Sequence, residues 1–288
     1  MRTVLRGQKY EVVIDPDQNF TVIGEKINPT GRKKLAETLA NRDYDYIRNL
    51  AIQQAAAGAD VLDVNVGAPG IDEVSVLPEV ARMVADSVDR PICLDSANRE
   101  ALAAALAVLP GKPLVNSVNG EEASLNRVLP VVKGYRAAVI GLTMDEKGIP
   151  ETAEGRLRVA EKILDRASQL GIPAEDVVID PLVLTVGANS KAASITLETV
   201  RLVRLEFGVN INLGASNVSF GMPERHTINQ AFLILGIAAG VTCAITDPMK
   251  LTLTIRAADL LLGRDDRGRR FLGSWRTLQA AQPAQAGP

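Results

Sequence analysis

Histidine and cysteine are scarce in this sequence, and their scarcity excludes several kinds of active site. The 288 residues include one histidine, His226, and two cysteines, Cys93 and Cys243, which lie far apart inside apolar runs. Such cysteines are expected to be buried thiols rather than a disulfide framework. A single histidine, with no cluster at zinc-ligand spacing, supports neither a metal hydrolase nor a cysteine nucleophile. We expect His226 at the surface or at a helix start.

The sequence also lacks an excess of one charge and a long apolar run. Lys and Arg number 32 against 34 Asp and Glu, for a formal net charge of -2, so no nucleic-acid partner is expected. The longest apolar stretch, residues 231–245, is shorter than the roughly 20 residues that cross a bilayer. Residues 1–20 have no apolar core of a signal peptide. We expect a cytoplasmic protein with no membrane or nucleic-acid partner.

Three glycine-containing signatures of catalytic or phosphate-binding loops are missing. The sequence has no Gly-x-Ser-x-Gly, no Gly-x-x-x-x-Gly-Lys-Ser/Thr and no Gly-x-Gly-x-x-Gly. Their absence argues against serine hydrolysis, P-loop phosphate binding and a Rossmann dinucleotide site.

Short runs rich in β-branched residues alternate with segments of helical periodicity. Eight strands are predicted, at residues 21–27, 61–66, 92–94, 114–117, 137–143, 177–179, 211–213 and 242–246, and each strand but the last is expected to precede a helix. The alternation predicts an α/β protein with a parallel sheet and crossover helices. Eight evenly spaced units favour a single (β/α)₈ TIM barrel over a doubly wound sheet.

The predicted barrel occupies residues 21–265 and leaves a segment at each end. Residues 1–20 are expected to form an extension, whose segment 9–14 pairs as a hairpin at the bottom of the barrel. Residues 276–288 have too little apolar surface to offset the entropy of ordering, and we expect a disordered tail there.

Polar residues follow nearly every predicted strand, at the end where a (β/α)₈ barrel builds its active site. They are Glu25 and Asn28, Asp63 and Asn65, Asp95 and Ser96, Asn116, Ser117 and Asn119, Thr143 and Asp145, Asp180, Ser216 and Asn217, and Asp247. At any single position the ordinary role of Asp or Asn is to cap the following helix. Their accumulation favours a site, in which either Asp63 or Asn65 faces the ligand.

The residue types at these strand ends limit the ligand. Asp and Asn with little positive charge suit a neutral heterocycle rich in amide-like donors and acceptors, such as a pterin. A carboxylate accepts two parallel donors from the pterin edge, and Asn satisfies the mixed edges of the ring.

Short motifs occur in order at the predicted strand ends. They are Gly-Glu-Lys-Ile-Asn (24–28), Asp-Val-Asn-Val-Gly (63–67), Leu-Asp-Ser (94–96), Val-Asn-Ser (115–117), Ile-Gly-Leu-Thr-Met (140–144), Ile-Asp-Pro-Leu (179–182) and Gly-Ala-Ser-Asn-Val-Ser (214–219). Together they resemble the pterin-binding methyltransferase family. This family includes methyltetrahydrofolate:corrinoid protein methyltransferases and the folate domain of cobalamin-dependent methionine synthase.

The resemblance implies a dihydropteroate-synthase-like barrel and a role for individual residues. It implies that Asp95, Asn116 and Asp180 hold the pterin, and that Asn217 lies near N5 as the catalytic residue. The expected substrate-binding residues are completed by Glu25, Asn65 and Arg225.

The resemblance further implies a methyltransferase of one-carbon metabolism. The methyl group would move between N5 of methyltetrahydrofolate and the cobalt of a corrinoid (cobalamin). No Asp-x-His-x-x-Gly motif of a cobalamin module is present, so the corrinoid is expected on a partner protein, and this chain is expected to bind no metal. A homodimer is implied as well.

Two other functions stay open at this stage. Dihydropteroate synthase is one, although residues 28–34 lack its Asn-x-Thr-x-Asp-Ser-Phe loop and Ser216-Asn217-Val218 stands where it has Ser-Arg-Lys. A non-catalytic folate-binding subunit is the other. A methyltransferase that uses a methylamine or methoxyaromatic donor would need a specialised donor site, for which the sequence has no signal.

Overall fold

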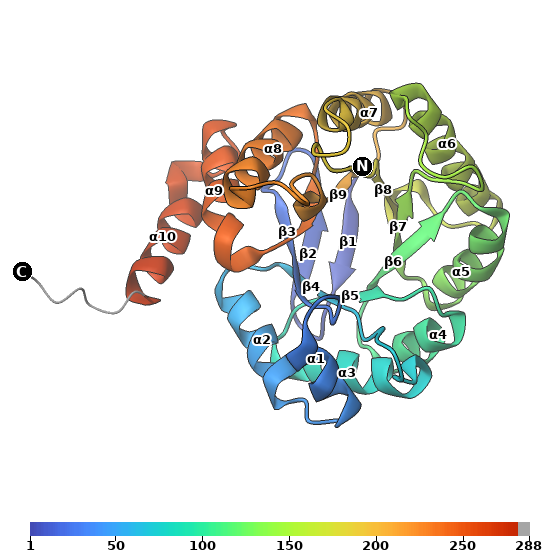
Figure 1. The fold of residues 1–288 in the computed structure, drawn as a ribbon, viewed down its shortest axis with the longest axis vertical. Coiled ribbons are helices and arrows are strands. Elements are labelled where there is room, and N and C mark those ends of the chain that lie inside the picture. The colour runs from blue at the N-terminus through green and yellow to red at the C-terminus, as the bar shows by residue number, and fades with distance from the viewer. Residues whose placement is uncertain (282–288) are drawn as a thin grey trace, which may run out of the picture.

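Eight parallel strands form a sheet that curves into a barrel. Figure 1 shows the computed structural model, and the structure describes residues 1–281. The strands are β3 (Thr21–Ile27), β4 (Val61–Val64), β5 (Ile92–Asp95), β6 (Leu114–Asn119), β7 (Ala138–Leu142), β8 (Val177–Asp180), β9 (Asn212–Gly214) and β10 (Cys243–Thr246). Their order is β8-β7-β6-β5-β4-β3-β10-β9, and a parallel bridge between Ile179 and Ile211 joins the two ends. The predicted (β/α)₈ barrel is confirmed, and the doubly wound sheet is excluded.

Helices surround the barrel and connect successive strands (Figure 1). They are α1 (Lys33–Ala40) and α2 (Asp45–Ala56) after β3, α3 (Glu73–Ser87), α4 (Arg99–Val108), α5 (Glu122–Tyr135), α6 (Ala153–Gln169), α7 (Ala192–Glu206), α8 (Arg225–Ala239) and α9 (Pro248–Leu261). The expectation that the last strand has no helix after it was wrong, because α9 follows β10. Asp247 caps α9 and proline stands in its first turn, a common helix start. In residues 1–281 no helix combines the length and apolar character needed to cross a membrane.

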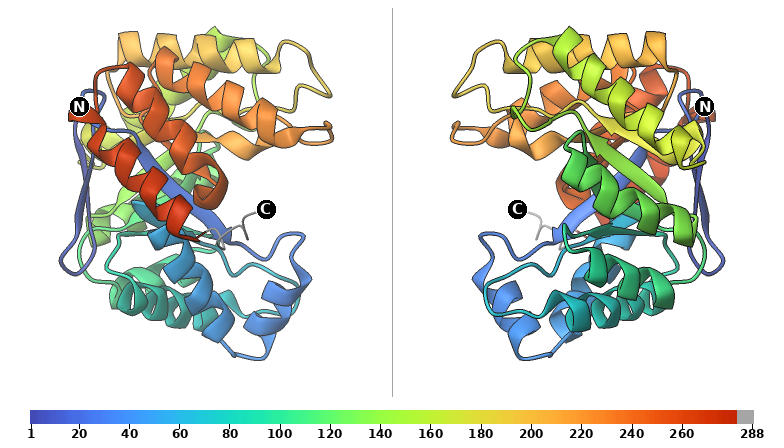
Figure 2. Two further views of the ribbon diagram at one scale, coloured as in Figure 1. Left: turned by 90° about the vertical axis from the view of Figure 1, so that its left-hand side faces the viewer. Right: turned by 90° about the vertical axis from the view of Figure 1, so that its right-hand side faces the viewer.

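An N-terminal hairpin closes the bottom of the barrel. Strands β1 (Thr3–Arg6) and β2 (Glu11–Ile14) pair in antiparallel fashion. The buried side chains of Leu5, Val12 and Ile14 belong to the same apolar cluster as Ile23 and Cys93 from the barrel strands. Figure 2 places the hairpin on the side of the molecule away from the long loops. The hairpin therefore covers this end of the barrel, and the strands finish at the opposite end.

A C-terminal helix, α10 (Arg269–Ala281), packs beside α9 and corrects the prediction of a disordered tail for residues 276–281. Its start is fixed because the carboxylate of Asp265 accepts hydrogen bonds from the backbone N–H groups of Arg270 and Phe271, at 3.0 and 2.9 Å. Once the helix has begun, the following residues continue its hydrogen-bond ladder. Residues 282–288 of the predicted tail lie outside the described part of the chain.

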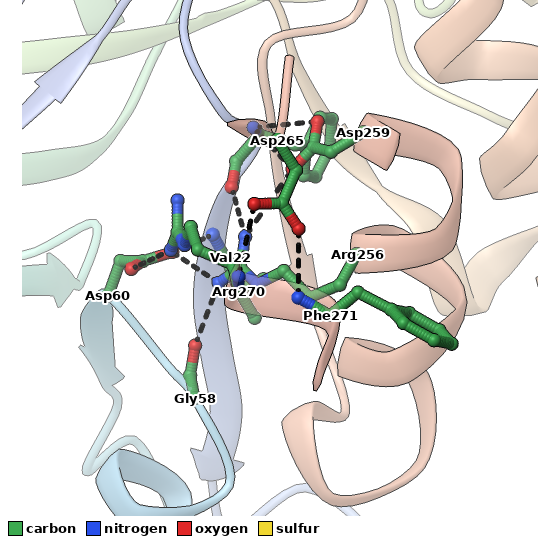
Figure 3. Close-up of polar contacts among 9 residues, drawn as sticks. Val22, Gly58, Asp60, Arg256, Asp259, Asp265, Arg270 and Phe271 are labelled. Carbon is green, nitrogen blue, oxygen red and sulfur yellow. Dashed lines mark hydrogen bonds and ion pairs between the residues drawn. The ribbon is translucent and has the colours of Figure 1, made fainter. Parts of the chain in front are cut away.

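A buried charge network ties α9 and α10 to the start of β3 (Figure 3). The side chain of Arg256 is 2% exposed and lies 3.2 Å from Asp60 and 3.6 Å from Asp259. Arg270 of α10 contacts the other carboxylate oxygen of Asp60 at 3.0 Å. Asp60 also accepts the backbone N–H of Val22 at 2.9 Å. Each charged side chain of the network contacts a group of opposite charge or a hydrogen-bond partner. We therefore assign the network a structural role.

Replacing Asp60 tests that role. In Asp60→Ala, Arg256 loses one of its carboxylates inside the protein and Arg270 loses its partner, so the free energy of unfolding should fall by about 3–5 kcal/mol. Urea unfolding, followed by the fluorescence of Trp275 on α10, measures the loss. Arg201→Ala, which removes an exposed pair with Glu198, should cost less than about 1 kcal/mol. An Asp60→Ala protein as stable as this control would contradict the assignment.

Candidate active site

A cavity of about 500 Å³ opens at the carboxyl ends of the barrel strands. It is lined by Glu25, Lys26, Asn28, Thr30, Arg32, Asp63, Asp95, Asn116, Leu142, Asp180, Leu182, Gly214, Ser216, Asn217 and Ile245. Figure 2 shows the β3–α1 segment and the β8–α7 and β9–α8 loops projecting on this side of the molecule. The predicted position of the site, at the strand ends, agrees with this cavity.

Three carboxylates on the floor of the cavity are each held by an asparagine amide. Asn116 donates to Asp63 at 3.3 Å, and Asn65 donates to Asp95 at 2.9 Å. Asn212, in the buried part of β9, donates to Asp180 at 2.7 Å. Each amide fixes one oxygen of its carboxylate, so the remaining acceptor positions have a defined direction.

Burial changes the proton affinity of these carboxyl groups. It raises the pKa of Asp180 to about 6, while hydrogen bonds from the Leu182 amide and Asn212 oppose the rise. The pKa of Asp63 is raised by burial and, second, by the neighbouring charge of Asp95. Burial also raises the pKa of Asp95, opposed by Asn65. A ligand with N–H groups would restore the hydrogen bonds that these groups lose on leaving water.

The end of β3 presents two consecutive side chains to the cavity. The pairing of β3 with β4 shifts register between Gly24 and Ile27, and in this irregular segment both Glu25 and Lys26 line the cavity. The backbone N–H of Lys26 donates to Oε1 of Gln54 at 2.9 Å. A Cβ atom on Gly24 would lie 2.5 Å from the same oxygen, so glycine is required for this close approach.

The end of β9 brings Asn217 to the mouth of the cavity. Among residues 1–281 its side-chain amide has no hydrogen-bond partner, and it is exposed toward the opening. A Cβ on Gly214 would lie 3.2 Å from Nδ2 of Asn217, so glycine leaves room for the amide. The preceding residue, Ser216, donates to Glu25 at 3.0 Å. Burial raises the pKa of Glu25, and the Ser216 hydrogen bond opposes the rise.

The structure brings five of the seven residues predicted from the sequence into the cavity wall. They are Glu25, Asp95, Asn116, Asp180 and Asn217. The other two, Asn65 and Arg225, are not among the residues that line the cavity.

Asn65 and Arg225 support residues of the wall rather than lining it. Asn65 donates to Asp95 and accepts the backbone N–H of Gly67 at 2.8 Å, which fixes its orientation. Arg225 donates to the backbone oxygen of Ser216 at 2.8 Å and to Ser219 at 3.1 Å. Of the two candidates at the end of β4, Asp63 lines the cavity. The strand ends at Val64, and Asn65, which follows it, does not line the cavity.

Two cations of the wall, Lys26 and Arg32, were not predicted as site residues. Lys26 pairs with Asp247 at 2.5 Å, and both residues are visible in the sequence as polar groups at strand ends. The sequence does not show which polar groups neutralise one another across the barrel. Among residues 1–281 no group of three His, Cys, Asp or Glu side chains is placed to hold a metal ion.

Comparisons with known proteins show which proteins the chain resembles. The family model described as pterin binding enzyme matches residues 24–247. The chain is 31% identical over 263 residues to the methylcorrinoid:tetrahydrofolate methyltransferase of Eubacterium limosum, covering 88% of this chain and 96% of that protein. It is 32% identical over 248 residues to the methionine synthase of Mycobacterium tuberculosis, covering 82% of this chain. The chain spans 21% of that longer protein.

Solved structures show the same fold at lower identity. The Yersinia pestis DHPS with a pterine-sulfa conjugate has a TM-score of 0.71 and 16% identity, covering 91% of this chain and 99% of that one. The dihydropteroate synthase from Xanthomonas albilineans in complex with 7,8-dihydropteroate has a TM-score of 0.64 and 18% identity, covering 87% and 95%. At these identities the likeness concerns the fold alone.

The raised pKa of Asp180 predicts a pH-dependent stability. An unfolded Asp has a pKa near 4, so the folded protein binds this proton more tightly than the unfolded chain. The stabilisation is fully present below about pH 4 and is lost as the pH rises through about 6.

The variant Asp180→Asn isolates this effect. From about pH 4 to about pH 8, the free energy of unfolding of the wild type should fall relative to the variant by roughly 2–3 kcal/mol. Urea unfolding across this range gives the difference, and only its pH dependence is diagnostic. Parallel pH profiles for the two proteins would rule out a raised pKa at Asp180.

Proposed function

Because the chain belongs to the pterin-binding enzyme family, we propose that it is a methyltransferase acting between methyltetrahydrofolate and a corrinoid. The methyl group moves between N5 of the folate and the cobalt of a corrinoid held by a separate protein. Similarity to a methylcorrinoid:tetrahydrofolate methyltransferase over 96% of that protein supports this activity. The single observation behind the proposal is the cavity floor of paired Asp and Asn side chains, with the Asn217 amide, which has no partner in the described part of the chain, at its mouth.

The proposed pterin site uses the floor carboxylates as acceptors. Asp95 and Asp180 accept the 2-amino and ring N–H donors of the pterin, and Asn116 satisfies a mixed edge of the ring. Each of these side chains lines the cavity. Asn65 contributes by orienting Asp95, and Arg225 by holding the backbone at Ser216 next to Asn217.

The proposed catalytic contact is between Asn217 and N5 of the folate. N5 is a tertiary amine and a poor leaving group, so breaking its bond to the methyl carbon requires stabilisation of N5 as the charge changes. In the demethylating direction the methyl carbon leaves for the Co(I) of the corrinoid, the electron pair of the broken bond stays on N5, and a proton from the solvent takes the place of the methyl group. An amide donates through nitrogen or accepts through oxygen, so Asn217 can hold N5 in either protonation state. A group positioned in advance for the developing charge lowers the barrier.

The neighbours of Asn217 keep it in place for this contact. Ser216 is fixed by its hydrogen bond to Glu25 at 3.0 Å and by the guanidinium of Arg225 on its backbone oxygen. Glu25 lines the same wall of the cavity and is our remaining proposed substrate contact.

The corrinoid would reach the methyl group from the open side of the cavity. Its cobalt supplies the methyl acceptor or donor when the partner protein is bound. Next to the mouth, Leu184 and Phe220 expose 38% and 69% of their surface, and we propose that the partner docks over them. We also propose that the protein forms a homodimer, as the family resemblance implies, and that it is cytoplasmic, as its two cysteines in apolar runs suggest.

The rival activity, dihydropteroate synthesis, is not favoured by the cavity. After β9 the wall consists of Gly214, Ser216 and Asn217, with no lysine at this strand end. The likeness to the synthases therefore concerns the fold, and we do not propose dihydropteroate synthesis as a second function.

Asn217→Ala tests the proposed catalytic contact. Methyl transfer from methyltetrahydrofolate to Co(I) cobalamin, followed by cobalt absorbance, should slow by about 100-fold or more, because a positioned hydrogen bond to the reacting atom is lost. The dissociation constant for the folate should change by less than about threefold, since the floor still binds the pterin. Asn189→Ala, an exposed amide of the β8–α7 loop outside the cavity wall, should change neither quantity.

Two outcomes would contradict the proposal. An unchanged transfer rate in Asn217→Ala would remove Asn217 from the mechanism. A wild-type protein that binds the folate but transfers no methyl group, even with corrinoid proteins supplied, would favour a non-catalytic folate-binding subunit.

A further inference from the structure

The charges of the cavity wall are separated between its floor and its rim. The floor contains the carboxyl groups of Asp63, Asp95 and Asp180, whereas the positively charged residues in the wall, Lys26 and Arg32, both come from β3 and the loop after it. Glu25 of β3 also lines the wall, where its carboxyl group accepts the hydrogen bond of Ser216. A ligand with a neutral head and an anionic tail fits this separation in one orientation. The head faces the acidic floor, and the tail leaves along the β3–α1 segment.

Arg32 is the cation of the wall that is free to bind an anion. The ammonium group of Lys26 lies 2.5 Å from the carboxylate of Asp247, which is largely buried. Arg32, by contrast, has no acidic partner among residues 1–281; one of its terminal nitrogens donates to the backbone oxygen of Lys26. This bond leaves most of the guanidinium donors available and holds the group at the edge of the cavity.

The loop before Arg32 fixes where this guanidinium stands. The backbone N–H of Thr30 donates to the side-chain oxygen of Asn28 at 3.0 Å, and the N–H of Arg32 donates to the oxygen of Pro29 at 2.9 Å. Gly31 completes the turn at φ +68, a conformation that glycine adopts without strain. Asn28 and Thr30 themselves line the cavity. The turn therefore presents Arg32 to a ligand at little cost in entropy.

We propose that Arg32 binds a carboxylate of the glutamate tail of the folate. This inference rests on the proposed function, because methyltetrahydrofolate combines an uncharged pterin with a glutamate whose carboxylates are ionised at neutral pH. The pairing of a guanidinium with a carboxylate is bidentate and charge-assisted. The other arginine near the mouth, Arg225, is outside the cavity wall and is already bonded to Ser216 and Ser219.

The residues after Arg32 extend the same positive surface. Lys33 is 92% exposed, and its ammonium group is 3.8 Å from Glu37, a weak surface contact. Lys34 lies with its ammonium group 4.3 Å from the centre of the Tyr46 ring. Arg32 is at the cavity, and Lys33 and Lys34 follow it at the start of α1; these two lysines would contact additional γ-linked glutamates. The site therefore selects polyglutamylated folates over the monoglutamate.

Isothermal titration calorimetry with three ligands tests the site. The ligands are methyltetrahydrofolate, its triglutamate, and 6-methyltetrahydropterin, which has no tail. In Arg32→Gln the dissociation constant of methyltetrahydrofolate should rise about tenfold, while that of the tailless pterin stays the same. Arg32→Lys should retain part of the affinity. Lys191→Gln, which removes an exposed cation of the β8–α7 loop at the same end of the barrel, should change none of the three constants.

The triglutamate tests the extension. The wild type should bind it more tightly than the monoglutamate, and the Lys33→Gln/Lys34→Gln double variant should lose that difference. Raising the salt concentration should also reduce the difference in affinity between the triglutamate and the monoglutamate.

The outcomes separate this inference from the proposed function. If the wild type binds folate and tailless pterin equally well, or if Arg32→Gln weakens both ligands by the same factor, the tail site is wrong while folate-dependent methyl transfer can stand. If the wild type binds no folate at all, the proposed function itself is wrong, and the tail site with it.

Discussion

The burial of ionisable carboxyl groups at the end of the barrel is the constraint on which the rest of the site depends. Moving a carboxylate out of water costs far more free energy than burying an apolar group gains, unless hydrogen bonds within the protein replace those to the solvent. Here each of Asp63, Asp95 and Asp180 receives an amide from Asn116, Asn65 or Asn212. The partners come from different segments of the chain, and the Asp180–Asn212 pair joins β8 to β9, the two ends of the sheet, so this pair exists only when the barrel is closed. The hairpin beneath and α9 and α10 beside the barrel maintain that closure.

The same constraint explains how one cavity can bind and orient a folate. Groups with raised pKa values on the floor favour a neutral head rich in N–H donors and disfavour an anion. The rim has the opposite charge at Arg32. Asn217 stands between the two regions, at the mouth, where N5 of a bound folate would meet a docking partner. The opposite charges of the floor and the rim therefore orient the folate so that N5 lies at Asn217. No strongly acidic or basic catalytic group is required.

The sequence was sufficient to predict the fold and most of the cavity wall. The eight strands follow from local patterns of β-branched residues, and the strand ends follow from the polar residues behind them. What could not be predicted depends on contacts between distant segments. Asn65 turned out to orient Asp95 because β4 ends at Val64, two residues before the end predicted from the sequence. Residues 276–281 became helical because Asp265 caps α10 and Asp60 binds Arg270. Neither contact can be predicted from the composition of the segment.

A crystal structure of the protein with methyltetrahydrofolate would test the central claim most directly, namely that the paired floor binds the pterin and leaves N5 at Asn217. We predict a pterin edge on Asp95, Asn116 and Asp180, with the Asn217 amide within hydrogen-bond distance of N5 and the methyl group facing the mouth. A pterin bound elsewhere, or one whose methyl group points into the floor away from Asn217, would contradict it.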